Sequence, residues 1–312
     1  MTRNELNIEI TRKWISLAKA KIEENYEKKL FKKGRKRTFP IEMYLKYIMY
    51  VLETGITWNN LIDTPCKPNT IRKQYGIWVG QGIFDDIHKE LLTAYDMETT
   101  NQSSPLLISE NNLFIDSTDI QNRNGTEKIT GFGIKFKNKR AMKIHSLCDE
   151  NKVSYSFVLT PANCSDSTVT ENVIDSSIVP LHHSNHNKLR ISGDKGYINR
   201  KTRDKLRDDN IILVTPPRRN QYEDSNRTRR KRVRGLNKKC LKKRINVEHS
   251  YSLLKRSYKR VNYLYERKLK HFYNFLLIAN SCIVLRNFIK CNMLPNCIKC
   301  NNLRSPSQKE RF

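Results

Sequence analysis

The stretch LFIDST, residues 113–118, marks the point where the pattern of the chain changes from helical to strand-like. Four more strand-like runs follow it, namely KIHSLCD at 143–149, VSYSFVLTP at 153–161, LRISGD at 189–194 and IILVTP at 211–216. Candidate helices occupy 166–178 and 199–209, between the later strands. Strands that come first and then alternate with helices predict a layered α/β core.

Before this core, the periodicity is helical, with predicted helices at 4–30, 41–53, 70–80 and 82–95. The first carries apolar residues at Leu6, Ile8, Ile10, Trp14, Leu17 and Ile22. Gly55 should end the second helix and Asn69 should cap the third. Short helices with glycine turns fit a helix-turn-helix, and a plain helical bundle fits the same spacing. We expect a helical, DNA-binding domain over 1–96 and a linker over 97–110.

After the predicted strands, the chain becomes strongly basic and loses its periodicity. RTRRKRVRGLNKKCLKKR at 227–244 has eleven basic residues in eighteen, so 218–244 is predicted to be an irregular insertion. Helical periodicity returns from Leu241, and 269–290 is a strongly apolar helix. We therefore predict one domain over 111–290 that contains this insertion, and a tail over 291–312.

The charge of the chain indicates a polyanionic partner. The 312 residues carry 59 Lys and Arg against 31 Asp and Glu, a formal net charge of +28. Nucleic acid is the favoured partner, because each cation that contacts a phosphate releases a condensed counterion and so strengthens binding. A membrane is not expected as the partner, because no basic amphipathic anchor is found and the apolar run at 275–285 is shorter than the ~20 residues of a bilayer span.

The compartment is predicted to be intracellular. The N-terminal MTRNELNIEITRKW lacks an apolar signal region, and eight scattered cysteines in a chain of this length indicate reduced thiols. We expect the protein to be found with DNA, in the nucleoid or, in a eukaryotic host, in the nucleus.

Two aspartates occupy positions at which catalytic carboxylates often lie. Asp116 lies inside the first strand, and Asp194 ends a later strand, where open α/β sheets bind their ligands. For each of them, a turn or helix cap is the alternative interpretation.

A third carboxylate stands alone in a basic field. Glu248 is the only acidic residue between Asp224 and Glu266, among fifteen Lys and Arg. An ion pair with Arg244 at i,i+4 is the alternative, but such pairs contribute only ~0.3–0.5 kcal/mol. Two Asp and one Glu would supply the hard oxygen ligands that a pair of divalent ions ~4 Å apart requires for phosphodiester chemistry.

On a helix, Arg244, Glu248, Tyr251 and Lys255 fall within about 60° of one another and form one polar stripe. At these residues the sequence resembles DDE-class transposases of bacterial insertion-sequence type, in the group with a Tyr-x2-Arg-x3-Glu-x6-Lys signature. Arg244, Glu248 and Lys255 match that spacing, whereas Leu241 stands at the position of the Tyr. FIDST, MKIHSLCDENKVSYSFVLTPANCSDS, SGDKGY, the early YIMYVLETGITWNNL and the closing FYNFLLIANSCIVLRN are also similar to family segments, so the resemblance covers about 40–289.

The resemblance implies an RNase H-like α/β fold, a mixed sheet flanked by helices, after an N-terminal helical domain. It implies that Asp116, Asp194 and Glu248 bind two Mg²⁺ ions, with Mn²⁺ as a substitute. Its reaction would be cleavage of double-stranded DNA at transposon ends, then attack of the freed 3′ hydroxyl on target DNA, carried out by a homodimer or larger multimer. DNA contacts are expected from Arg244, Lys255, Lys195, Arg229, Arg230, Lys231 and Arg232.

Two other functions remain open from the sequence. One is a transposase-derived DNA-binding protein without catalysis, for which Leu241 is the only indication. The other is a basic RNA-binding or nucleoprotein structural component, which would explain the charge but not the three acids. Other polar residues of the resembling segments, His145, Asp149 and Asp166, have no assigned role, and Asp119 lies close enough in the chain to be mistaken for Asp116.

Overall fold

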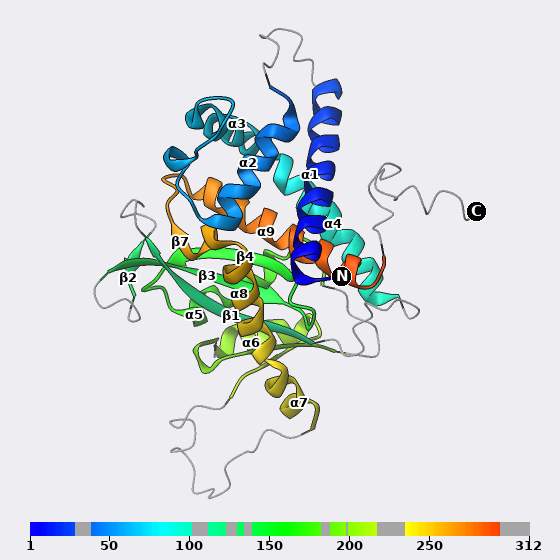
Figure 1. Cartoon of the computed structure of the whole chain (residues 1–312). Coiled ribbons are helices and arrows are strands. Elements are labelled where there is room, and N and C mark those ends of the chain that lie inside the picture. The colour runs from blue at the N-terminus through cyan, green and yellow to red at the C-terminus, as the bar shows by residue number, and fades with distance from the viewer. Residues whose placement is uncertain are drawn as a thin grey trace, which may run out of the picture. The chain divides into compact units, whose positions relative to one another are not determined.

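The structure is a computed structural model that describes residues 1–28, 39–101, 112–122, 130–133, 139–181, 188–197, 199–216 and 235–293 (Figure 1). The chain divides into two compact units. The sheet unit comprises Ile108–Asn122 and Thr126–Leu253. The helical unit comprises Met1–Leu107, Arg123–Gly125 and Leu254–Phe312.

The sheet unit is built on the strands that the sequence predicts. Its strands are β1 (Asn112–Asn122), β2 (Gly131–Phe132), β3 (Arg140–Cys148), β4 (Ser154–Pro161), β5 (Leu189–Gly193) and β6 (Ile211–Val214). All five predicted strands are present, and the two-residue β2 is an addition that periodicity could not reveal.

The order of the strands defines the fold class. β1 runs antiparallel to β3 and parallel to β5, β3 pairs antiparallel with β4, and β5 pairs parallel with β6. Since β1 and β4 pair with the same residues of β3, they lie on opposite sides of it, which gives the core order β4-β3-β1-β5-β6. This mixed sheet with flanking helices confirms the predicted RNase H-like α/β core.

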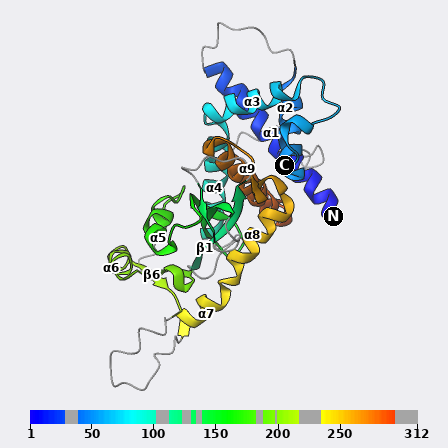
Figure 2. The same cartoon turned by 90° about the vertical axis from the view of Figure 1, so that its left-hand side faces the viewer.

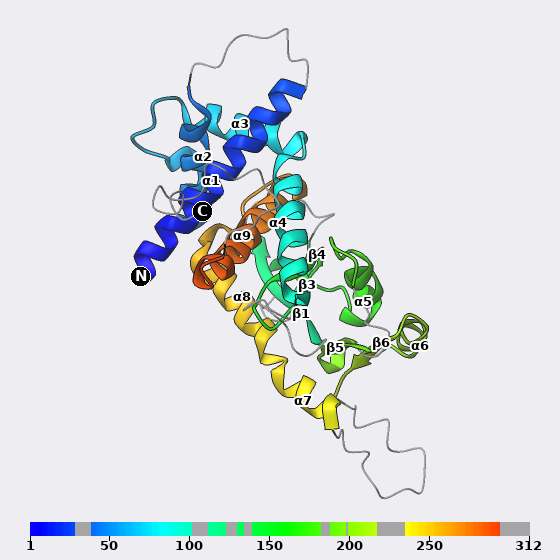
Figure 3. The ribbon, with the colours of Figure 1, turned by 90° about the vertical axis from the view of Figure 1, so that its right-hand side faces the viewer.

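Helices cover both faces of this sheet. Figures 2 and 3 show α5 (Asp166–Asp175) and α6 (Arg200–Asp208) on one face, and α7 (Gly235–Lys243) and the start of α8 (Ile245–Ser257) on the other. α7 corrects the prediction of an irregular segment up to residue 244, because 235–243 are helical. The earlier part of that predicted insertion, 218–234, lies outside the described residues.

The helical unit contains α1 (Arg3–Lys28), α2 (Ile41–Thr54), α3 (Pro68–Gly80), α4 (Ile83–Thr100) and α9 (Leu269–Lys290), with the short elements η1 (Trp58–Asn60), η6 (Lys259–Asn262) and β7 (Tyr263–Leu264). Gly55 ends α2 in the left-handed conformation, at φ 74°, as the sequence predicts. Two local predictions were wrong. Ile8 is 59% exposed, and Asn69 lies inside α3, which begins at Pro68.

The last helix, α9, belongs to the core of the helical unit. It packs against α1, α3 and α4, and Tyr75 of α3 stacks on its Phe275 at 4.6 Å between ring centroids. Within the described residues α9 is the one helix long and apolar enough to cross a membrane, but 78% of that apolar window is buried. This helix was predicted to belong to the domain of the sheet, whereas its contacts group it with the N-terminal helices.

The buried His88 makes the helical unit sensitive to acid. Burial lowers the pKa of its imidazole from 6.5 to about 3, and its neighbours Asn280 and Ser281 carry no charge. Between these pH values the unfolded chain binds a proton that the folded chain does not. Stability therefore falls as the pH falls, by up to about 1.4 kcal/mol per pH unit for this one group.

We expect His88→Gln to reduce the loss of unfolding free energy between pH 6.5 and pH 5 by about 2 kcal/mol. Urea titrations followed by tryptophan fluorescence at both pH values measure it. His249→Gln, which replaces an exposed imidazole, is the matched control. Equal pH dependence of wild type and His88→Gln would show that another group carries the sensitivity.

Candidate active site

Asp116 lies at the centre of the sheet and faces the helices α7 and α8. Because side chains alternate along a strand, Asp116 points to one face of β1 and Ser117 to the other. The register pairs Ile115 of β1 with Gly193 of β5, so Asp116 and Asp194 follow directly on neighbouring parallel strands. Asp194, at the carboxyl end of β5, is exposed. The fold therefore brings together two acids that are 78 positions apart in the chain.

Arg244 joins Asp116 to Glu248. Its Nη1 lies 2.9 Å from Asp116 Oδ2 and its Nη2 lies 3.0 Å from Glu248 Oε1. Arg244 occupies the turn between α7 and α8, and Glu248 lies in the first turn of α8. The i,i+4 ion pair considered as the alternative is thus present, but the same guanidinium also binds the central strand. That second contact makes Glu248 part of a cluster with Asp116.

Tyr251 holds α8 against the sheet beside Asp116. Its buried hydroxyl donates to the Asp116 carbonyl oxygen at 2.7 Å or to that of Ile144 at 3.0 Å, and accepts from Ser146 Oγ at 3.0 Å. The sequence placed Tyr251 on a polar stripe. It is instead only 7% exposed, because its ring packs into the core while its hydroxyl meets strand oxygens. No pattern in the sequence signalled this contact.

The electrostatics of Asp116 reflect a cluster of carboxylates. Burial raises its pKa, the Ser117 amide and Arg244 lower it, and the negative charges of Asp194 and Glu248 raise it again. The negative charges of Asp194 and Glu248 therefore both act on the Asp116 carboxylate. Such a cluster favours the binding of positive charge.

The donor set fits divalent metal ions. Asp116, Asp194 and Glu248 offer carboxylate oxygens, which Mg²⁺ and Mn²⁺ prefer. As the side chains stand, no three acidic, imidazole or thiol groups within the described residues are close enough to share one ion. Asp116 and Glu248 are instead bridged by Arg244, whose guanidinium meets the need for positive charge. Glu248 is 47% exposed, so its carboxylate has room to adopt another rotamer.

A second polar cluster lies on the opposite face of β1. Asp166 Oδ1 accepts from Ser117 Oγ at 3.2 Å and from Lys143 Nζ at 3.1 Å, and lies 3.7 Å from His145 Nδ1. Asp166 Oδ2 lies so close to Gly196 that a Cβ at that glycine would be 2.9 Å away. Asp166 therefore packs against the turn that follows Asp194, a contact that its place in the sequence did not reveal.

Two of the other residues without an assigned role, His145 and Asp149, bond to neighbouring groups of the sheet unit, and Asp119 lies away from Asp116. His145 is buried and bonds to Thr160 Oγ1 at 2.8 Å, and burial lowers its pKa to about 4. Asp149 Oδ1 accepts from the Val153 amide at 2.9 Å and shapes the turn between β3 and β4. Asp119 lies three residues beyond Asp116 on β1, so strand alternation directs it to the opposite face.

The predicted DNA-contacting residues are only partly described. Lys195 is exposed and follows Asp194 directly, in η4 (Lys195–Tyr197). Lys255 is half-buried, two turns along α8 from Glu248, in the part of that helix that groups with the helical unit. Arg229, Arg230, Lys231 and Arg232 lie outside the described residues. Leu241, at the position of the family's Tyr, is half-buried in α7.

An RNase H-like sheet with carboxylates on its two central parallel strands and on a following helix defines a class of phosphoryl-transfer proteins. The family model of the transposase DDE domain matches residues 109–285, more than half of the chain, so the chain belongs to that family. Neither a curated protein nor a solved structure matches the chain significantly.

Proposed function

We propose that the protein is an active DNA transposase that cleaves double-stranded DNA at transposon ends and joins the freed 3′ hydroxyl to target DNA. The observation that supports this most directly is the grouping of Asp116 with Asp194 on the neighbouring strand and with Glu248 through Arg244. Membership of the transposase DDE domain family indicates that the substrate is DNA. A derivative that binds DNA without cutting it is the alternative.

In this proposal, Asp116, Asp194 and Glu248 hold two Mg²⁺ or Mn²⁺ ions. When bound, such ions activate the attacking oxygen and stabilise the leaving one. Asp116 is held in place by its strand and by Tyr251, which bonds its carbonyl oxygen. For the ions to bind, Arg244 would have to release Asp116 and Glu248. Its guanidinium could then bind a DNA phosphate beside the site.

The partners follow from the same proposal. Lys195, Lys255 and the run Arg229–Arg232 would contact DNA phosphates, and the helical unit would bind the duplex at the transposon end. Joining two ends to one target requires at least two active sites, so a homodimer or larger multimer on DNA is expected. The protein would act inside the cell, where its DNA is.

A cleavage assay with duplex DNA carrying the element's own ends tests the function. Wild type should nick it in Mg²⁺ or Mn²⁺ and not in EDTA, and Asp116→Asn should not nick it in either metal. Asp119→Asn, on the other face of the same strand, should cleave like wild type. DNA binding by wild type without cleavage in either metal would favour the non-catalytic derivative.

Gly196→Ala should reduce cleavage by about 10²-fold, since a misplacement of about 1 Å in an active site can have that effect. The added Cβ would be 2.9 Å from Asp166 Oδ2, so either that carboxylate, which bonds to Ser117 and Lys143, or the turn that carries Asp194 must shift. Gly80→Ala, where a Cβ meets nothing within 4 Å, is the control. The same assay measures both, and cleavage by Gly196→Ala at the wild-type rate would show that Asp166 does not position that turn.

A further inference from the structure

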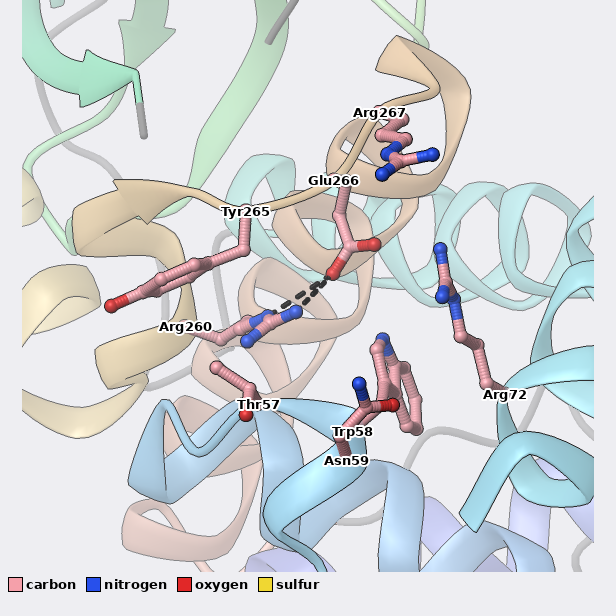
Figure 4. A pocket seen from close by; sticks show the side chains of 8 residues that line it. All are labelled: Thr57, Trp58, Asn59, Arg72, Arg260, Tyr265, Glu266 and Arg267. Carbon is pink, nitrogen blue, oxygen red and sulfur yellow. Dashed lines mark hydrogen bonds and ion pairs between the residues drawn. The ribbon is translucent and has the colours of Figure 1, made fainter. Parts of the chain in front are cut away.

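The helical unit contains a pocket that the proposed cleavage reaction does not use. Its volume is about 250 Å³, and Figure 4 shows the side chains that line it. They come from η1 and the residue before it, from α3, and from the segment that runs from η6 to the start of α9, so chain segments about 200 residues apart in sequence form one site. Its charged and aromatic lining consists of Trp58, Arg72, Arg260, Tyr265, Glu266 and Arg267.

One wall of the pocket is a buried ion pair. Arg260 donates to Glu266 Oε1 from Nε at 3.1 Å and from Nη2 at 2.5 Å, and both side chains are nearly inaccessible to solvent. Arg260 is held further by the Ile56 carbonyl oxygen at 3.0 Å and by the Tyr265 ring at 4.7 Å. The charge of Glu266 is therefore neutralised within the wall.

Two further arginines give the pocket its net charge. Arg72 and Arg267 are exposed, and within the described residues neither has a carboxylate partner. Figure 4 shows their side chains reaching toward one another from separate segments. With Arg260 offset by Glu266, the pocket carries two positive charges, and planar guanidinium groups suit the oxygens of a phosphate.

Trp58 adds a buried hydrogen-bond donor that has no acceptor. Its indole Nε1 lacks a partner within the described residues, and Trp58 is only 4% exposed. The ring is fixed by Tyr75 and Phe275, at centroid distances of 5.6 and 6.1 Å. Trp14 and Trp78 also have unpartnered nitrogens, but neither lines the pocket. A buried N–H without an acceptor is costly, and a ligand oxygen that also pairs with the two arginines would satisfy it.

We propose that this pocket binds a phosphate group of the DNA backbone, with Arg72 and Arg267 as the cations and Trp58 as a neutral donor. The proposal rests on the proposed function in that DNA is the substrate. It adds a contact in the helical unit that positions the duplex and takes no part in the chemistry. Phosphate contacts of this kind fix the register of a protein on DNA without reading its sequence.

The test compares two double variants that remove equal charge. Arg72→Gln/Arg267→Gln changes the pocket, and Lys73→Gln/Lys268→Gln changes the exposed neighbours next in the chain, which do not line it. Binding of a fluorescent duplex is measured by anisotropy over a range of salt concentrations in Ca²⁺, so that cleavage is not required. The pocket variant should bind at least about tenfold more weakly, with a salt slope lower by about 1 than that of the control.

Trp58→Phe separates a binding role from a structural one. It removes the unpartnered N–H and keeps the aromatic packing, so the free protein should be as resistant to urea as wild type. Its affinity for the duplex should nevertheless fall severalfold, with an unchanged salt slope. If Trp58→Phe and wild type bind the duplex with equal affinity, the indole N–H does not contact the bound phosphate.

Three results would overturn the proposal. If both double variants bind the duplex with the same affinity and salt slope, the pocket takes no DNA phosphate, whether or not wild type cleaves DNA. If inorganic phosphate binds wild type and not the pocket variant while duplex affinity is unchanged, the pocket is a site for free phosphate. If wild type does not bind the duplex at all, the proposed function fails together with this site.

Discussion

Glu248→Gln is expected to lower metal-dependent cleavage of transposon-end DNA by at least about 10²-fold, because even residues that only support metal ligands contribute about 10- to 100-fold. The substitution keeps the shape of the side chain, and its amide oxygen can still accept from Arg244 Nη2, which lies 3.0 Å from Glu248 Oε1. It removes the negative charge and a strong oxygen ligand. Affinity for DNA should not fall, since the variant repels phosphates less than wild type does.

Titration with Mn²⁺ by calorimetry gives an independent measurement of the same variant. Wild type should bind two ions and Glu248→Gln should bind fewer. Glu150→Gln is the matched control, because Glu150 lies in the same unit and its carboxylate pairs with Lys243 at 2.9 Å. Metal binding and cleavage by Glu248→Gln at wild-type levels would exclude Glu248 as a ligand. If both proteins bind DNA and neither binds metal or cuts, the protein is a DNA-binding derivative.

Glu266→Gln should give the largest loss of stability, about 3–5 kcal/mol of unfolding free energy, because it leaves a buried cation without its partner. The Arg260 and Glu266 side chains are 2% and 3% exposed. Arg260 cannot turn to solvent easily, since the Ile56 carbonyl oxygen and the Tyr265 ring hold it. Replacing both residues with Met should recover much of the loss, because two apolar side chains leave no uncompensated charge.

Tryptophan fluorescence during urea unfolding measures the loss of unfolding free energy in the helical unit itself. All three tryptophans of the chain, Trp14, Trp58 and Trp78, belong to the helical unit. Glu42→Gln is the control in that unit, since its ion pair with Lys19 is 38% exposed on both sides and exposed pairs contribute little to stability. A shift for Glu266→Gln no larger than that of the control would mean that the buried pair does not stabilise the unit.

The sequence by itself determined the elements and the candidate acids. Alternating and β-branched runs predicted β1 and β3–β6 because a half-buried strand needs that pattern whatever surrounds it. The isolation of Glu248 in a basic field, and the place of Asp194 after an apolar run, were also visible, since both are properties of the chain. Local pattern failed at α7, whose basic residues mask the helical periodicity.

Only the tertiary structure decided which of these residues meet. The contact of Asp116 with Arg244 joins residues 128 positions apart, and the bonds of Tyr251 to β1 and β3 depend on where α8 packs. The grouping of α9 with the N-terminal helices, and the pocket between η1 and Glu266, depend in the same way on packing. Periodicity reports which face of an element is buried and carries no information about its neighbour, so long-range partners follow from the packing of complementary surfaces.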